Sequence, residues 1–504
     1  MRISLASSVF MAVSLVVLAC LLPSMAFAQP APASLTIAEE TVSWDDSVSV
    51  TFERGALTVP VNRARGSEAT ITVEVARFRR DAEASPDTPP IFVMRGGPGY
   101  PGIDDELDRS NYYRGYIRPF LAVADVVFVG QRGFGSSTDT PCDDREALSL
   151  DDAFDDAVRE RANRAAMDRC RAKWEAEGLD LTGFNVIEAA GDVADAARAL
   201  GYEQIQLFGN SFGTHHGMAV MRYYPSLVTR VTFGALEGPD HTYDSPSGLL
   251  DALEHIAASV EMSETLAPYL PEEGLLEAYR ALIAQADAEP IVVETKHPDT
   301  DEPITVRLDG DDFRELSRGT TRGLAWRYIM PAWPLDLLTM LDGDYEAAAR
   351  RIFRLNTRTG QRNAAFYQLD CGSGITAERG ARYRTSPAAS LFGPLWRTYD
   401  VECQAWDADL GDDFRTGFAT DIPALLMHGT WDMSTPYENA LDLLPAFRTR
   451  YFVTVVGGSH GALWEAVEAN ERFDALLQWM ATGDASGLPE RVVLAPMEWR
   501  APEE

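Results

Sequence analysis

Short, largely apolar segments followed by glycine-rich or small polar loops are the feature that most constrains how this 504-residue chain can fold. Such segments lie at residues 90–94, 125–129, 204–208, 230–233, 422–427 and 451–456. Runs of this length and composition are typical of strands buried on both faces of a parallel sheet. Amphipathic helical patterns lie between several of them, as at residues 186–200. This alternation predicts an α/β fold with a mostly parallel sheet and right-handed crossovers.

The strand pattern stops in the middle of the chain and resumes near the end. Residues 240–420 are acidic and mostly helical in pattern, and they contain no second copy of the flanking segments. We therefore expect a core domain in two parts, residues 29–239 and 421–504. The intervening residues 240–420 are expected to form a helical cap inserted before the strand at 422–427.

The first 28 residues have the pattern of a secretory signal peptide. A basic start is followed by a nearly uncharged apolar run over residues 3–22, and an Ala-Phe-Ala sequence ends at Ala28. This order predicts cleavage after Ala28 and a secreted or periplasmic protein. The alternatives are a retained membrane anchor or lipid attachment at Cys20. No later segment is apolar for long enough to cross a bilayer, so stable membrane insertion after cleavage is not expected.

Loss of the signal peptide would leave four cysteines, at positions 142, 170, 371 and 403. An even number in an exported chain suggests disulfides, for which three connectivities are possible. Our hypothesis is local pairing, Cys142 with Cys170 and Cys371 with Cys403, and the alternative is four buried thiols. No pair has the spacing of zinc ligands, so no metal site is expected.

The charge balance limits the class of partner. The formal net charge is −33 at pH 7, and a chain this acidic repels phosphate backbones. Binding to nucleic acid is therefore not expected, whereas attraction of cationic groups is.

A Gly-Asn-Ser-Phe-Gly motif at residues 209–213 lies between the strand at 204–208 and a helical segment. Gly-x-Ser-x-Gly in this context places a serine on a sharp, strained strand-to-helix turn, with its hydroxyl exposed above the sheet. We therefore predict that Ser211 is a nucleophile. Residues 457–461 match the same pattern around Ser459, but no histidine follows His460 in the chain. The order serine, acid, histidine that such sites use consequently favours Ser211.

His460 and Asp432 are the predicted partners of Ser211. His460 follows the last strand in a glycine-lined loop, and Asp432 follows the strand at 422–427. In these roles Ser211 would attack a carbonyl, His460 would take and return the proton, and Asp432 would orient the imidazole. The other histidines are less well placed, because they lie on helices, in the cap or directly before the acid loop: His215, His216, His241, His255, His297 and His428.

An attacking serine also requires N–H groups that stabilise the oxyanion. One is expected from the backbone of Phe212 and the other from Gly97, with Gly96 as the neighbouring candidate, in the loop after residues 90–94. That loop also contains the spacing of a dinucleotide-binding motif, Gly97-x-Gly99-x-x-Gly102. Prolines interrupt it and no ribose-binding acid follows the next strand, so no cofactor is expected.

Three motifs together carry a resemblance to a known family. They are Gly-Gly-Pro-Gly at 96–99, Gly-Gln-Arg-Gly-Phe-Gly-Ser at 130–136, and the serine motif continued by Thr214. The sequence resembles the prolyl aminopeptidase and tripeptidyl aminopeptidase family of α/β hydrolases over residues 56–240 and 420–465. Residues 170–182, Cys371 and residues 429–436 are most similar to the exported tripeptidyl branch.

The resemblance implies an α/β-hydrolase fold and a serine peptidase that removes residues from the free N-termini of short peptides. Such an enzyme must hold a cationic amine, and Glu237 is our candidate for that role. The inserted residues would then form a lid that limits the pocket to short peptides. Two positions depart from the family pattern: Gly130 replaces an aspartate, and Phe212 replaces a tyrosine.

The motifs leave two other functions open. The same serine, acid, histidine and oxyanion loop would serve an esterase or amidase acting on small acyl substrates, because these groups support acyl transfer in general. A third reading is a catalytically idle hydrolase fold that acts as a binding protein.

Overall fold

The computed structural model describes residues 33–502 except 46–47, 101–102, 104–112, 324–325, 361–362, 394–400, 407 and 470–472. The predicted signal peptide, with Cys20, lies outside this range. Among the described residues, no helix combines the length and hydrophobicity needed to span a bilayer.

A 10-stranded sheet forms the centre of the molecule, with the strand order β1-β2-β3-β5-β4-β6-β7-β10-β11-β12. The strands are β1 (Ser34–Asp45), β2 (Val48–Pro60), β3 (Thr70–Phe78), β4 (Ile91–Met94), β5 (Val126–Val129), β6 (Ile205–Ser211), β7 (Val228–Leu236), β10 (Ala424–Gly429), β11 (Arg450–Val456) and β12 (Arg491–Val493). The pairs β1–β2, β2–β3 and β3–β5 are antiparallel, and every other pair of neighbouring strands in the sheet is parallel. The mostly parallel sheet expected from the sequence is therefore confirmed.

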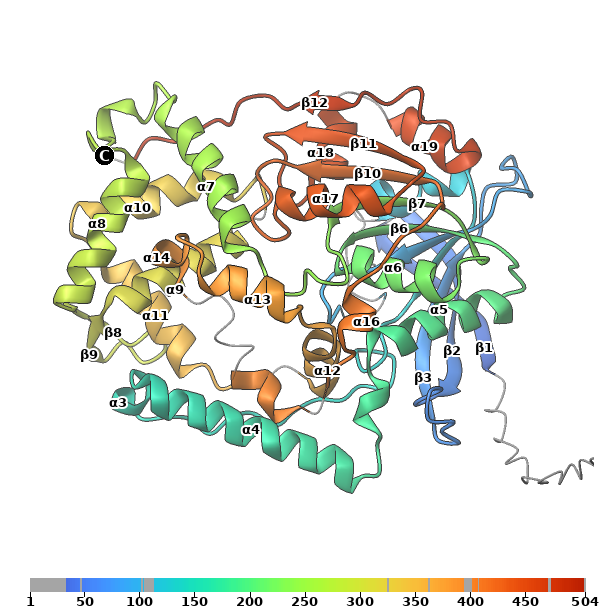
Figure 1. Cartoon of the computed structure of the whole chain (residues 1–504), viewed down its shortest axis with the longest axis horizontal. Coiled ribbons are helices and arrows are strands. Elements are labelled where there is room, and N and C mark those ends of the chain that lie inside the picture. The colour runs from blue at the N-terminus through green and yellow to red at the C-terminus, as the bar shows by residue number, and fades with distance from the viewer. Residues whose placement is uncertain are drawn as a thin grey trace, which may run out of the picture.

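Helices cover both faces of this sheet (Figure 1). On one face α5 (Val186–Ala199), α6 (Phe212–Tyr223) and α17 (Tyr437–Leu443) share a buried hydrophobic cluster with the strands. On the other face α18 (Ala462–Ala469) and α19 (Phe473–Thr482) share a second cluster with them. Both faces are buried because each central strand contributes apolar side chains to the two clusters in turn.

Many of the residues between β7 and β10 form a mainly helical body on the left in Figure 1. Its elements include α7 (Pro246–Glu261), α8 (Leu275–Ala288), α9 (Gly310–Gly323), α10 (Trp333–Leu341), α11 (Glu346–Thr357) and the hairpin β8 (Ile291–Lys296) and β9 (Pro303–Leu308). These elements bury a hydrophobic cluster of their own. In contrast, α12 (Ala364–Ser373) packs its apolar side chains into the cluster on the α5–α6 face of the sheet. Part of the inserted segment thus belongs to the packing of the sheet.

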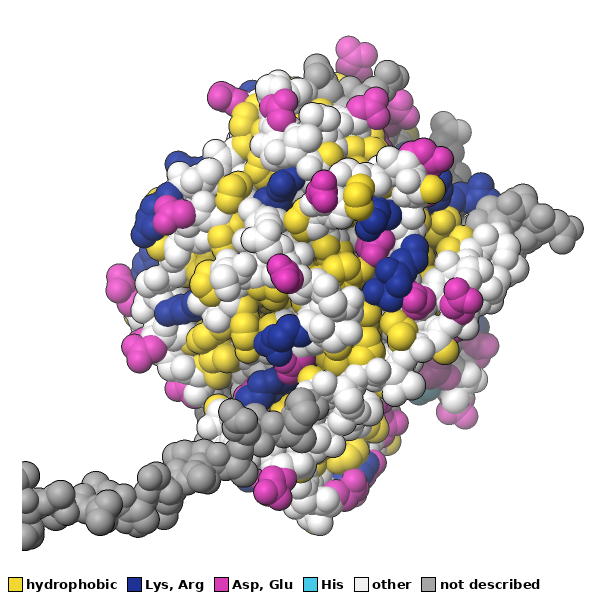
Figure 2. Space-filling model, turned by 90° about the vertical axis from the view of Figure 1, so that its right-hand side faces the viewer, with side chains coloured by type: hydrophobic (Ala, Val, Ile, Leu, Met, Phe, Trp, Pro, Cys, Tyr) yellow, Lys and Arg dark blue, Asp and Glu magenta, His cyan; other side chains and the backbone are white. Residues whose placement is uncertain are grey.

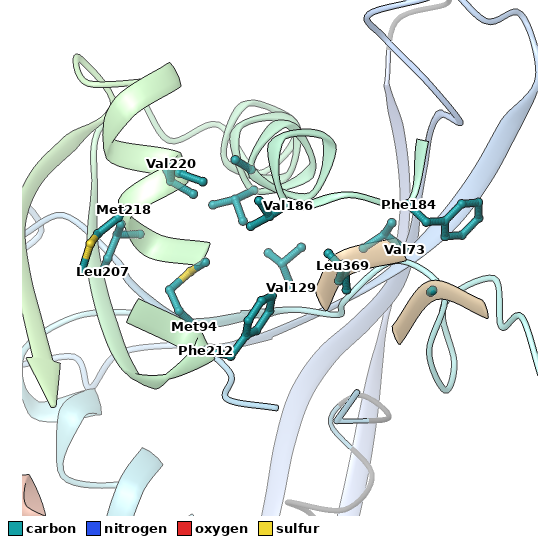
Figure 3. Close-up of a cluster of buried hydrophobic side chains, with 14 of the residues drawn as sticks. Val73, Met94, Val129, Phe184, Val186, Leu207, Phe212, Met218, Val220 and Leu369 are labelled. Carbon is teal, nitrogen blue, oxygen red and sulfur yellow. The ribbon is translucent and has the colours of Figure 1, made fainter. Parts of the chain in front are cut away.

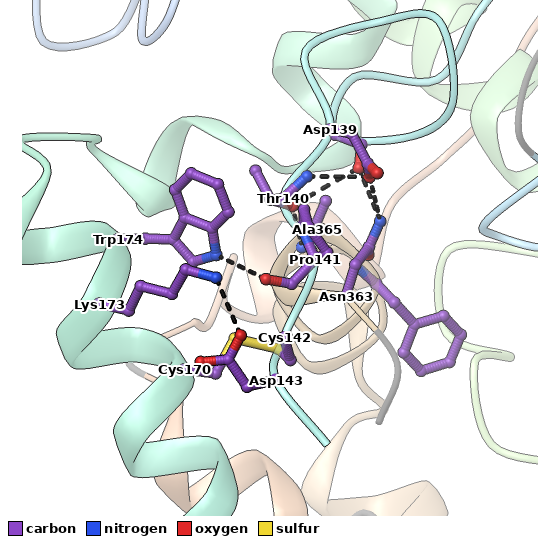
Figure 4. Close-up of a disulfide and its surroundings, with 12 residues drawn as sticks. Asp139, Thr140, Pro141, Cys142, Asp143, Cys170, Lys173, Trp174, Asn363 and Ala365 are labelled. Atoms are coloured by element: carbon purple, nitrogen blue, oxygen red, sulfur yellow. Dashed lines mark hydrogen bonds and ion pairs between the residues drawn. A yellow bond between two sulfur atoms is a disulfide. The ribbon is translucent and has the colours of Figure 1, made fainter. Parts of the chain in front are cut away.

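Both local disulfides are present. Cys142 is bonded to Cys170 of α4 (Asp156–Ala176), and Cys371 of α12 is bonded to Cys403. Around the first, Lys173 pairs with Asp143 at 3.2 Å and the Trp174 indole donates to the Pro141 carbonyl at 3.3 Å (Figure 4). The two crosslinks fix the loop after β5 and helix α12, which both border the site described below.

On the face that lies on the right in Figure 1, arginine side chains lie among acidic and hydrophobic ones (Figure 2). Arg77 of β3, which is buried, pairs with Glu53 of β2 at 2.5 Å.

Candidate active site

Neighbouring strands bring the predicted site residues to one edge of the sheet. β4 pairs with β6 so that Met94 lies opposite Gly209, and the loops after both strands leave the sheet side by side. β10 lies between β7 and β11, and Asp432 and His460 follow β10 and β11. The carboxyl ends of parallel strands meet at the same edge, and the crevice at the point where strand order reverses is the usual ligand site of such sheets.

Ser211 occupies the strained turn that its motif predicts. It is the last residue of β6 and directly precedes α6, with a φ of 59° and a ψ of −136°. A Cβ atom on Gly213 would lie 2.1 Å from the Met94 carbonyl oxygen, and one on Gly209 would lie 2.9 Å from the Gly213 carbonyl oxygen. Only glycine fits at these two positions, so the close approach of strand and helix explains the residue types of the motif.

Asp432 and His460 form a buried pair. The His460 Nδ1 atom lies 3.0 Å from both carboxylate oxygens of Asp432, which is fully buried. The N–H groups of Ser434 and Thr435 donate to Asp432 Oδ1 at 2.9 Å, and the Thr435 hydroxyl donates to Oδ2 at 2.9 Å. These bonds fix the carboxylate, which in turn fixes the imidazole with Nδ1 protonated.

The pair shifts the ionisation of both residues. Burial disfavours the charged form of Asp432, but the charge of His460 and its hydrogen bond outweigh burial, and the pKa of Asp432 lies below its ordinary value. Burial likewise opposes protonation of His460, but the charge and hydrogen bond of Asp432 prevail and raise its pKa above 6.5. A base held in this way is neutral only at pH values above its raised pKa.

His428, which the sequence placed next to the acid loop, is a structural support for that loop. Its Nδ1 accepts the Leu236 N–H at 3.0 Å, and its Nε2–H donates to the Thr435 carbonyl at 2.7 Å. Both ring nitrogens are used in the neutral form, and burial lowers the pKa of His428 below 6.5. His428 thus ties the acid loop to the end of β7.

The second serine motif also has a structural role. Ser459 is fully buried, and its N–H and hydroxyl both donate to the Glu465 carboxylate, at 2.8 and 2.5 Å. Glu465 lies in α18, one turn beyond the histidine loop. Ser459 therefore anchors the loop that carries His460.

Ser211 and His460 lie on adjacent loops but are not hydrogen-bonded. The side chain of Asn210 donates to the His460 carbonyl at 3.4 Å, which docks the histidine loop against the serine turn. Within the described ranges, no hydrogen bond joins the Ser211 hydroxyl to the imidazole. Bonds between a nucleophile and its base are often long or misaligned until substrate binds.

The predicted oxyanion loop lies against the serine. A Cβ atom on Gly96 would be 3.5 Å from the Ser211 Cβ, and Gly97 has a φ of +112°. The backbone N–H of Phe212 is at the start of α6, while its side chain points into the hydrophobic cluster beside Met94 and Val129 (Figure 3). The Phe212 side chain therefore serves packing and leaves its N–H at the turn.

Gln131 holds the oxyanion loop in place, a role that we did not predict from the sequence. Its side-chain amide donates to the carbonyls of Arg95 at 3.2 Å and Gly96 at 2.9 Å. Its carbonyl oxygen accepts the Gly99 N–H at 2.8 Å. One buried side chain thus connects both ends of the Gly-Gly-Pro-Gly turn.

A cavity of about 630 Å³ opens beside Ser211, the oxyanion loop and the acid loop. Among the residues that the structure describes, its lining includes four carboxylic acids, Asp139, Glu237, Asp244 and Asp370, but neither lysine nor arginine. Burial, followed by the charges of Asp370 and Asp244, raises the pKa of Glu237 well above 4.5. A cationic group in the cavity would offset this repulsion between the acids and favour their charged forms.

Glu237 is held at a fixed place relative to the serine. Its N–H donates to the Thr214 hydroxyl at 2.8 Å, and that hydroxyl donates to the Ser211 carbonyl at 2.8 Å. Asp244 and Asp370 approach the same cavity from the segment before α7 and from α12. Sequence reasoning found Glu237 because it closely follows a strand, but the other two lie in the inserted segment, where no motif marked them.

Two histidines after the serine are buried structural residues. His215 donates from Nδ1 to the Gly238 carbonyl at 2.9 Å, and its Nε2 accepts the Ser373 hydroxyl at 3.0 Å. Burial lowers the pKa values of His215 and His216 to about 4.

No group of three or more histidine, cysteine or acidic side chains in the described part of the chain is placed to hold a metal ion.

Comparison with known families agrees with this architecture. Residues 89–264 match the family described as alpha/beta hydrolase fold, and residues 388–480 match the family described as TAP-like protein. The sheet, the serine turn and these matches show that the chain has the α/β-hydrolase fold.

Comparison with solved structures finds similar chains that have diverse names. A proline iminopeptidase-related protein from Thermus thermophilus is 14% identical, with a TM-score of 0.35 over 88% of this chain and 99% of that one. A thermophilic esterase from Thermogutta terrifontis is 12% identical, with a TM-score of 0.36 over 84% and 97%. An epoxide hydrolase from an endophytic Streptomyces is 15% identical, with a TM-score of 0.35 over 87% and 98%. At these levels of similarity the neighbours say nothing about the substrate.

Proposed function

We propose that this α/β hydrolase is an exported serine aminopeptidase that cleaves amide bonds near the free N-termini of short peptides. The observation that carries the proposal is the acidic cavity beside Ser211. Its described lining combines Glu237, Asp244 and Asp370 with the predicted nucleophile and contains no lysine or arginine. A peptide ammonium entering the cavity would neutralise charges that otherwise repel one another.

The proposed reaction proceeds through an acyl-enzyme. His460 removes the proton from Ser211, and the serine oxygen attacks the carbonyl carbon of the scissile bond. The N–H groups of Phe212 and Gly97 stabilise the oxyanion. When the tetrahedral intermediate collapses, the C–N bond breaks and His460 gives its proton to the leaving amine. Water then attacks the ester by the same route and frees Ser211.

Asp432 would act by holding and stabilising the imidazole. Its two bonds of 3.0 Å to Nδ1 keep Nε2 as the atom that accepts the serine proton. The negative charge also stabilises the imidazolium that forms during the reaction. This arrangement accounts for a buried carboxylate next to a base.

Two further features support the proposal, one for the peptidase activity and one for export. The sequence resembles the aminopeptidase family in its three glycine motifs, and residues 388–480 match a TAP-like family. The two disulfides are typical of proteins outside the reducing cytosol. Export, the peptidase activity and the choice between single residues and tripeptides remain parts of the proposal.

The test compares peptide and ester substrates with the mature protein and a Ser211→Ala variant. Proline and tripeptide anilides would be supplied with free or acetylated N-termini, together with short acyl esters. We expect anilide cleavage that requires both Ser211 and a free amine. Ester turnover without anilide cleavage would instead identify an esterase, and inactivity on all substrates would favour a binding protein.

A further inference from the structure

Exposed aromatic side chains extend from the proposed base toward solvent. The Trp326 ring packs against the His460 imidazole in an edge-on arrangement, with centroids 5.6 Å apart. Tyr328 stacks on Trp326 with centroids 6.5 Å apart and an angle of 29° between the planes. Neither aromatic residue lines the acidic cavity. The site therefore has a second, aromatic surface outside that cavity.

These side chains are exposed, although Arg327, which lies between Trp326 and Tyr328, anchors the segment through its side chain. Trp326, Tyr328 and Ile329 have exposed fractions of 37%, 80% and 39%. Between them, Arg327 donates to the Gly457 carbonyl at 2.7 Å and lies over the Trp431 ring at 5.6 Å. The segment is thus fixed to the histidine loop. A group of exposed apolar side chains at such a place is typical of a binding surface.

The chemistry of the proposed reaction decides which part of a substrate this surface would meet. The imidazole must deliver a proton to the leaving nitrogen, so the leaving portion of the peptide has to lie next to His460. The acyl portion, with its ammonium group, faces the oxyanion loop and the acidic cavity. An aromatic surface that begins at His460 and lies outside that cavity is consequently adjacent to the leaving portion.

We infer that Trp326, Tyr328 and Ile329 bind the part of the peptide on the carboxyl side of the scissile bond, and that they favour an aromatic or large apolar first residue there. The inference rests on the proposed function. Aromatic faces bind such side chains through stacking and apolar contact. Substrates that differ only beyond the scissile bond should therefore be cleaved with different efficiencies.

The experiment uses pairs of peptides that are identical up to the scissile bond and carry phenylalanine amide or glycine amide beyond it. The measured quantity is the ratio of kcat/KM for the phenylalanine peptide to that for the glycine peptide. We expect Tyr328→Ala to reduce this ratio by about 3- to 10-fold, the usual range for one aromatic contact. Trp326→Phe should keep a ring against His460 and reduce the ratio less.

Tyr269→Ala provides a control, because Tyr269 is another exposed tyrosine of the inserted segment, with an exposed fraction of 47%, and lies after α7. This control should keep the wild-type ratio. An unchanged ratio in Tyr328→Ala, or an equal fall in Tyr269→Ala, overturns the inference.

Failure of the proposed function has a different signature. If the wild type cleaves esters but no peptides, the aminopeptidase proposal fails, and the ratio is then measured with phenyl and methyl esters of one acid. If Tyr328→Ala does not change the ratio in that series, the inference that Trp326, Tyr328 and Ile329 bind the leaving portion is overturned as well. A wild type that turns over neither class overturns both proposals.

Discussion

His460 Nδ1 lies 3.0 Å from each carboxylate oxygen of Asp432, although the two residues are 28 positions apart and follow different strands. Their contact arises because β10 and β11 are parallel neighbours in register from Ala424 opposite Arg450 to Gly429 opposite Val455. Loops that follow such a pair emerge at the same edge of the sheet. The backbone of the acid loop then fixes the carboxylate through Ser434 and Thr435.

Replacing Asp432 by asparagine should leave the fold intact and lower kcat by about 10⁴-fold, because the amide would favour the wrong imidazole tautomer. Steady-state kinetics on any cleaved substrate measures this effect. Thr435→Val removes the hydroxyl donor to Asp432 but keeps the carboxylate, and its loss should be much smaller. Equal activity in wild type and Asp432→Asn would contradict the role of the pair.

The two serine motifs should respond differently to substitution. Ser211→Ala should abolish labelling by a fluorophosphonate and lower kcat by at least about 10³-fold. Ser459→Ala should keep the labelling but lower the free energy of unfolding, because it leaves the partly buried Glu465 carboxylate without a hydroxyl partner. Labelling that persists in Ser211→Ala and disappears in Ser459→Ala would exchange the two assignments.

The shifted ionisation of His460 gives a pH dependence with a definite sign. A base must be neutral to accept a proton, and the pKa of His460 is raised above 6.5 by Asp432. The value of kcat/KM should therefore rise with pH through an apparent pKa above 6.5. NMR titration should assign this pKa to the signal that His460→Ala removes. His215 and His216, with pKa values lowered to about 4, should titrate far below it.

Gln131 is expected to act on the rate through the oxyanion loop. Gln131→Ala removes the three hydrogen bonds to Arg95, Gly96 and Gly99 and should lower kcat by roughly 10- to 100-fold with little change in KM, since small misplacements of catalytic groups are costly. Gln131→Glu can still accept the Gly99 N–H but cannot donate to the two carbonyls. It should therefore resemble Gln131→Ala, and a fully active Gln131→Glu would refute the positioning role.

Glu237 provides the test of amine recognition. Glu237→Gln keeps the shape of the side chain but cannot ionise when an ammonium group binds, and we expect KM for free-amine peptides to rise by about 10- to 100-fold, as for a lost charge-assisted hydrogen bond. Short acyl esters lack the ammonium group and should be affected much less. If KM for free-amine peptides is unchanged, Glu237 does not bind the amine.

The sequence located the strands that carry the site because burial on both faces imposes uniform apolar composition. The predicted segments at 204–208 and 422–427 became β6 and β10. It missed β1, the 12-residue partner of β2 at the antiparallel edge, because its residues are exposed or only partly buried and have no continuous apolar pattern. Edge strands of this kind are specified mainly by pairing with a neighbour.

The chain by itself determined the serine turn. A Cβ atom on Gly209 would lie 2.9 Å from the Gly213 carbonyl oxygen, within the motif itself, whereas the 2.1 Å contact that excludes a Cβ on Gly213 is with Met94 of β4. The order of strands and loops along the chain also pointed to Asp432 and His460, because each of them follows a predicted strand. These are short-range properties of the chain or direct consequences of strand order.

Only the tertiary structure decided which side chains surround the serine. Asp370 comes from α12 and Asp244 from the segment before α7, and they join Glu237 through the packing of the inserted segment on the sheet. Gln131 holds the oxyanion loop, and Trp326 reaches His460 from the middle of that segment. Contacts between polar or exposed side chains that are far apart in the chain leave no periodic pattern in the sequence, because they require no repeated burial of apolar residues.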